Sequence, residues 1–176
     1  MNFKLIIPTI EYADEIKAYR DEMLKYGSTF DGTSYLKRLE NPAEWIEYNK
    51  TLMNKETVPD GLVQATQFIY IREDDGKIVG MINVRHYFND FLEKYGGHIG
   101  YSVRPSERRK GYAKNMLNEA LKYCKELGLS KVLISCLSDN EGSRKTILAN
   151  GGVYENTVKL PDSNECLERY WIDIND

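Results

Sequence analysis

The sequence predicts a mixed α+β fold, a single domain over residues 1–176 whose central, mostly antiparallel sheet carries helices on both faces. The expected elements follow the order β-α-α-β-β-β-α-β-α-β-β, with one strand–helix–strand crossover in an otherwise antiparallel pattern. The chain has 176 residues and is 41% hydrophobic, which suits one core and is too short for two domains. No linker, repeat or low-complexity segment divides it.

The N-terminal half is expected to hold a strand, two helices and a hairpin. The apolar run FKLII predicts the strand, and Thr9 is a candidate cap for a helix that begins near residue 11. In the stretch NPAEW, Asn41 is expected to cap the second helix and Pro42 to take its first position. Two strand-like runs surround Asp75-Gly76, a dipeptide that tight hairpin turns favour.

The C-terminal half alternates strands and helices. The stretch GGHIGYSV predicts a strand that Arg104-Pro105 ends, because proline cannot donate to a ladder. Apolar residues at helical spacing follow from Ala113 to Leu127, and Gly128 supplies the stop. KVLISCL predicts a buried strand, NEGSRKTILANGG a short helix, and GVYENTVKL and ECLERYWIDI two closing strands.

Composition narrows the class of protein. The net charge of −3 argues against a general nucleic-acid or membrane-surface binder. Three cysteines without a C-x-x-C pair indicate a reduced compartment, and with two histidines they predict no metal site. No stretch approaches about 18 consecutive apolar residues, and no export signal precedes the first strand, so we expect a cytoplasmic protein.

The basic stretch RPSERRKGYAKNM lies between a predicted strand and the first turn of a predicted helix. A helix start offers unpaired N–H groups and partial positive charge, so it binds phosphate readily. Gly111 and Ala113 allow close approach to the backbone, while Arg108, Arg109 and Lys110 add charge. No P-loop or G-x-G-x-x-G pattern occurs. The stretch predicts an anion site, with a solvated basic turn as the alternative.

These residues resemble the GNAT superfamily of acyl-CoA-dependent N-acetyltransferases. The family signature, R/Q-x-x-G-x-G/A after a strand that ends in Val, is matched by VRPSERRKGYA with Arg108, Gly111 and Ala113 in register. NEGSRKTILANGG is similar to the second CoA motif, with Asn140 and then Ser143. The closest branch in motif is that of the N-terminal and ribosomal-protein acetyltransferases.

The resemblance implies acetyl-CoA as cofactor and a splay between the strands HIGYSV and KVLISC that admits it. The turn from Arg108 to Ala113 would hold the pyrophosphate, and the strand end at residues 102–104 would pair with the pantetheine amides. Asn140 would hydrogen-bond the cofactor arm. The implied cofactor-binding residues are Ser102, Val103, Arg104, Arg108, Arg109, Lys110, Gly111, Tyr112, Ala113, Asn140 and Ser143.

Two catalytic candidates follow, Ser143 and His98. Many relatives carry a tyrosine acid seven residues after the Asn, where this chain has Ile147, and the resembling branch implies the Ser143 hydroxyl instead. The position of the family's catalytic glutamate is Gly100, and strand alternation puts His98 on the same face as a candidate base. The alternatives are that Ser143 only bonds backbone or CoA and that His98 is only a hydrogen-bonded strand residue.

The predicted function is acetyl-CoA-dependent N-acetyltransfer to a primary amine by direct attack in a ternary complex. The acceptor would be a small amine, an amino acid or a peptide N-terminus; no nucleic acid or membrane is expected, and a homodimer is left open. An acyl-CoA-binding sensor module without catalysis is the alternative. An acidic bias over the first two helices mildly favours a cationic acceptor, although a solvated helix face explains it equally well.

Overall fold

The computed structural model describes residues 1–175 and has two antiparallel sheets. The first has the order β1-β2-β3-β4 and comprises β1 (Phe3–Ile6), β2 (Ala65–Arg72), β3 (Lys77–Arg85) and β4 (Ile99–Val103). The second has the order β5-β7-β6 and comprises β5 (Lys131–Leu137), β6 (Val153–Lys159) and β7 (Cys166–Asp173). The helices are α1 (Ala13–Lys25), α2 (Pro42–Met53), α3 (Tyr112–Glu126) and α4 (Glu141–Ala149), with short turns η1 (Ile10–Tyr12), η2 (Leu92–Gly96) and η3 (Pro105–Glu107).

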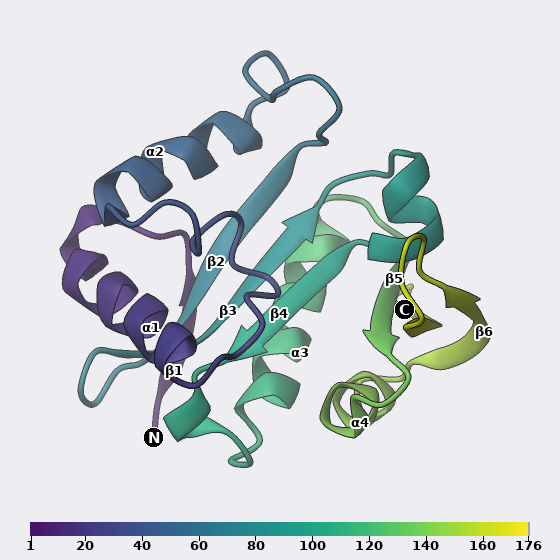
Figure 1. The fold of residues 1–176 in the computed structure, drawn as a ribbon. Helices are drawn as coiled ribbons and strands as arrows, with labels where there is room; N and C mark the ends of the chain where they lie inside the picture. Colours follow the sequence, from purple (N-terminus) through teal and green to yellow (C-terminus); the bar gives the residue numbers. More distant parts are fainter. Residues whose placement is uncertain (176) are drawn as a thin grey trace.

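Helices cover both faces of the first sheet (Figure 1). On one face α1 and α2 bury Ile16, Tyr19 and Trp45 against β2 and β3. On the other face α3 packs against β1, β3 and β4 and shares a core with β5 and α4. The mixed α+β fold class predicted from the sequence is confirmed.

The two sheets meet at His98. Its backbone N–H donates to the Leu133 carbonyl at 2.8 Å, and its Nδ1 accepts from the Leu133 N–H at 2.9 Å. The preceding Gly97 has a φ of +67°, and a Cβ there would lie 2.6 Å from the Leu133 carbonyl oxygen. Beyond this junction β4 and β5 do not pair with each other. Each is an edge strand of its own antiparallel sheet, so the two do not form one mixed sheet.

The local signals read from the sequence are confirmed with one exception. The Asn41 side chain caps α2 by accepting from the Ala43 N–H at 2.9 Å, and β2 and β3 pair around residues 73–76. Thr9 lies at the N-cap of the 3₁₀ turn that precedes α1, and its side chain makes no capping hydrogen bond. Within residues 1–175 no helix is both long and apolar enough to cross a bilayer.

Candidate active site

A cleft of about 1080 Å³ opens where the two sheets separate. Its walls include residues 99–103 of β4 and residues 135–137 of β5, the two facing edge strands. Because β4 pairs with β3 along one edge only, its other edge can pair with an extended ligand. One end of the cleft reaches the start of α3, and the other reaches η2, residues 61–63 and α2, while residues 29–35 lie beside β4 between them.

The turn before α3 forms the floor at the first end. Gly111 adopts a φ of +81° at the N-cap of α3, and no atom lies within 4 Å of the position that its Cβ would take. No side chain caps this helix, so its first N–H groups face the cleft without a side-chain acceptor. Open space beside uncapped helical N–H groups is the arrangement that binds phosphate oxygens.

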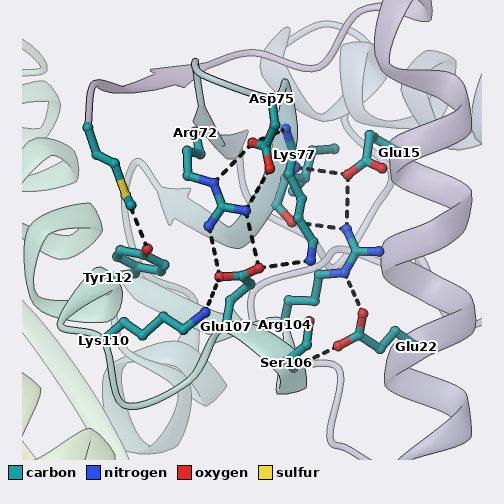
Figure 2. A network of polar contacts seen from close by, with 12 residues as sticks. Glu15, Glu22, Arg72, Asp75, Lys77, Arg104, Ser106, Glu107, Lys110 and Tyr112 are labelled. Atoms are coloured by element: carbon teal, nitrogen blue, oxygen red, sulfur yellow. Dashed lines mark hydrogen bonds and ion pairs between the residues drawn. The ribbon is translucent and has the colours of Figure 1, made fainter.

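Ion pairs hold this turn against the first sheet (Figure 2). Glu107, only 4% exposed, lies 2.9 Å from Arg72, 2.8 Å from Lys77 and 2.8 Å from Lys110. Burial alone would raise the pKa of Glu107, but these three cations outweigh it and lower the pKa to about 2. The carboxylate therefore stays ionised and anchors the turn.

A second set of ion pairs fastens the end of β4 to α1. Arg104 reaches Glu22 at 2.6 Å and Glu15 at 2.9 Å, and the Ser106 N–H donates to Glu22 at 2.7 Å (Figure 2). The Arg104 backbone N–H donates to the Val79 carbonyl. The guanidinium group and the backbone N–H of Arg104 are thus both bonded to other residues of the protein.

Opposite the turn, two hydroxyl groups meet across the cleft. The Tyr101 hydroxyl, from β4, lies 2.7 Å from Ser143 Oγ at the start of α4. Burial raises the pKa of Tyr101 to about 12, although its bond with Ser143 acts in the other direction. The Asn140 side chain accepts from the Ser143 N–H at 3.1 Å and so caps α4. Tyr101 therefore keeps its proton and can donate it in a hydrogen bond.

The sequence model of the acetyltransferase (GNAT) family matches residues 31–151. The chain belongs to the GNAT acetyltransferase family. Enzymes of this family use acetyl-CoA as the acetyl donor, and the uncapped turn at Gly111 fits its pyrophosphate. Curated proteins give no sequence match.

Solved structures share the fold of this GNAT protein. The ribosomal-protein-S5-alanine acetyltransferase from Vibrio fischeri has a TM-score of 0.71 at 18% identity, over 100% of this chain and 95% of that one. An N-acetyltransferase from Staphylococcus aureus Mu50 has a TM-score of 0.69 at 18% identity, over 99% and 100%. The microcin C7 self-immunity acetyltransferase MccE, in complex with acetyl-CoA and AMP, has a TM-score of 0.70 at 18% identity, over 98% and 92%.

Most of the cofactor-binding residues expected of a GNAT enzyme come together in the cleft. The predicted residues that line it are Ser102, Val103, Arg108, Arg109, Gly111, Tyr112, Ala113, Asn140 and Ser143. Arg104 and Lys110 are not among the described lining residues, because their side chains are paired with Glu22, Glu15 and Glu107. Their direct contact with the cofactor stays a prediction, and their described ion pairs hold the turn in place.

The candidate base, His98, lies outside the described lining of the cleft. Its Nδ1 accepts from the Leu133 N–H, and its ring contacts Phe88 in a tilted arrangement with centroids 4.1 Å apart. Burial, with a smaller effect of the nearby Arg85, lowers the pKa of His98 to about 4. Its role as a base stays a prediction, and these contacts favour the other role that the sequence left open, a hydrogen-bonded residue at the junction of the sheets.

Sequence reasoning missed Tyr101. Ile147, at the usual tyrosine position, is fully buried in the core, and the Tyr101 hydroxyl reaches the start of α4 from the opposite wall instead. The available signal was its place in GYSV, on the strand that leads into the cofactor turn. That signal could not identify Ser143 as its partner, because the two residues lie 42 positions apart.

Proposed function

We propose that the protein transfers the acetyl group of acetyl-CoA to a primary amine by direct attack in a ternary complex. One observation carries the proposal: one cleft extends from the turn at Gly111 to a second, aromatic-walled end at η2, residues 61–63 and α2. Donor and acceptor can therefore enter from opposite ends and meet beside β4. A site that only binds acyl-CoA has no need of the second end.

The chemistry requires one new bond, one broken bond and one proton moved. The amine nitrogen bonds the acetyl carbon, the C–S bond breaks, the nitrogen loses a proton, and the CoA sulfur gains one. A thiol has a pKa near 8.5, about 3.5 units below that of Tyr101, so full proton transfer from Tyr101 would cost roughly 5 kcal/mol. We propose that Ser143, bonded to Tyr101, stabilises the leaving thiolate by donating a hydrogen bond.

Thiol release from acetyl-CoA, measured with a panel of amines, amino acids and short peptides, tests the proposal. At least one acceptor is expected to raise the rate above that of hydrolysis, with the acetylated product seen by mass spectrometry. Acetyl-CoA binding without turnover on any acceptor would instead support the sensor module. A protein that fails to bind acetyl-CoA would overturn both.

A matched pair of glycine variants tests the donor end. Gly111→Glu is expected to abolish acetyl-CoA binding by calorimetry, because its side chain enters the open space before α3 and repels phosphate. Gly128→Glu controls for backbone strain, since Gly128 has a φ of +84° and equally open surroundings at the far end of α3. Equal loss of binding in both variants, or in neither, would refute the assignment of the turn.

A further inference from the structure

The acceptor end of the cleft contains a cation that has no ion-pair partner among the described residues. Arg85, the last residue of β3, lines the cleft and forms no ion pair with any residue in the range 1–175. Its one described side-chain hydrogen bond, to the Gly96 carbonyl, is long at 3.4 Å. Burial lowers the pKa of Arg85 to about 10, although Asp31 acts in the other direction, so the group remains charged near neutral pH.

The guanidinium group lies beside the middle of β4. A Cβ built on Gly100 would stand 3.4 Å from Arg85 Nη2 and 3.5 Å from Nη1. Gly100 itself lines the cleft, and the backbone nitrogen of Gly32 would lie 3.3 Å from the same Cβ. An acceptor bound beside Gly100 would therefore lie close to this guanidinium.

The acidic bias of the first two helices suggests a negatively charged acceptor end that would favour a cationic acceptor. The residues that line this end do not fit that suggestion. None of those acidic side chains lines the cleft, and two of them, Glu15 and Glu22, are paired with Arg104. The charged residues at the acceptor end are Arg85 and Asp31, and the latter is exposed. A partly buried cation that faces a cleft of low dielectric repels a cationic ligand and attracts a carboxylate.

The remaining walls of the acceptor end are largely aromatic and apolar. Their described members are Phe30, Tyr35, Tyr48, Leu52, Leu62, Val63, Phe91 and Tyr95. Tyr35 and Tyr48 meet edge to face with centroids 5.3 Å apart, on the loop before α2 and on α2 itself. Such a wall gains free energy by burying an apolar side chain of the acceptor.

We propose that Arg85 binds the carboxylate of the acceptor, and that the acceptor is therefore a free amino acid with an apolar side chain. The inference rests on the proposed acetyltransfer. Arginine presents a planar fork of donors that matches a carboxylate in two parallel bonds. The same positive charge lowers the pKa of a neighbouring ammonium group, which favours the neutral amine that attacks the thioester.

Matched acceptors test the role of Arg85. For leucine, methionine and phenylalanine, kcat/KM is measured with the free acid, the amide and the decarboxylated amine. The amide is the less basic amine, so the comparison is the acid-to-amide ratio in each enzyme rather than the absolute rates. Arg85→Gln is expected to lower this ratio at least tenfold for the preferred acceptor, and Arg85→Lys to lower it less. The loss should appear mainly in KM for the acid.

Two controls separate a binding role from a structural one. Lys50→Gln removes a cation from an exposed ion pair on α2 outside the described cleft lining and should leave the ratio unchanged. Acetyl-CoA binding by calorimetry should be the same in the native protein and in Arg85→Gln. An unchanged ratio in Arg85→Gln, or a loss confined to kcat on all acceptors alike, would overturn the inference. Turnover with amides and amines alone would overturn it as well, while leaving the proposed acetyltransfer intact.

Discussion

Replacing Glu107 by glutamine tests the anchor of the cofactor turn. The substitution keeps the size of the side chain but removes the charge that Arg72, Lys77 and Lys110 share. Arg72 retains Asp75 at 2.7 Å, while Lys77 and Lys110 lose their described acidic partner (Figure 2). Both the fold and the turn that leads to Gly111 should be less stable.

The shift in the pKa of Glu107 sets the size of the effect. Its pKa falls from 4.5 to about 2, a difference of about 2.5 units, which corresponds to roughly 3 kcal/mol. The folded state holds its proton less tightly than the unfolded state, so this stability is present above pH 4.5 and is lost as the pH falls toward 2. At about pH 3 we expect some 1.4 kcal/mol to remain. The network lies near the surface, so screening makes these values upper figures.

Urea unfolding of the native protein and of Glu107→Gln at pH 7 and about pH 3 measures the difference at each pH. The gap in unfolding free energy should be at most about 3 kcal/mol at pH 7, should narrow at pH 3, and should be accompanied by weaker acetyl-CoA binding. Glu47→Gln, which removes an exposed partner of Lys50, should cost under about 0.5 kcal/mol. A gap at pH 7 no larger than that of Glu47→Gln, or one that does not narrow in acid, would refute the reasoning.

The hydroxyl pair and the junction histidine give two further predictions. Tyr101→Phe and Ser143→Ala should each lower kcat about tenfold or more with little change in acetyl-CoA affinity, because the thiolate forms only as the C–S bond breaks. If only the KM for acetyl-CoA rises, the two residues bind the cofactor and do not act on the leaving thiolate. His98→Asn, whose Oδ1 can replace Nδ1 as acceptor, should cost stability at pH 7. That cost should shrink by up to about 3 kcal/mol between pH 6.5 and 4, because the folded state resists protonation of His98; a pH-independent cost would contradict the lowered pKa.

Local patterns in the sequence were sufficient for the helices, the hairpin and the conformation of the turn before α3. The Asn41 cap, the buried stripe of α1 and the open glycine at residue 111 each depend on residues within a turn or two along the chain. Periodicity, capping chemistry and backbone preference act over that range, so these features can be predicted from the sequence alone. The same local match carried the family resemblance.

The tertiary structure alone decided what the side chains of the site do. Tyr101 meets Ser143 across 42 positions, Arg104 meets Glu15 across 89, and His98 is held by Leu133 across 35. Arg85 reaches the space beside Gly100 only because β3 and β4 pair in one register. Such contacts follow from how two sheets pack and separate, a balance of many long-range interactions that no local pattern encodes. The sequence by itself therefore determined where acetyl-CoA is expected to bind, and only the packing of the two sheets brought Tyr101 to Ser143 and left Arg85 without an ion-pair partner among residues 1–175.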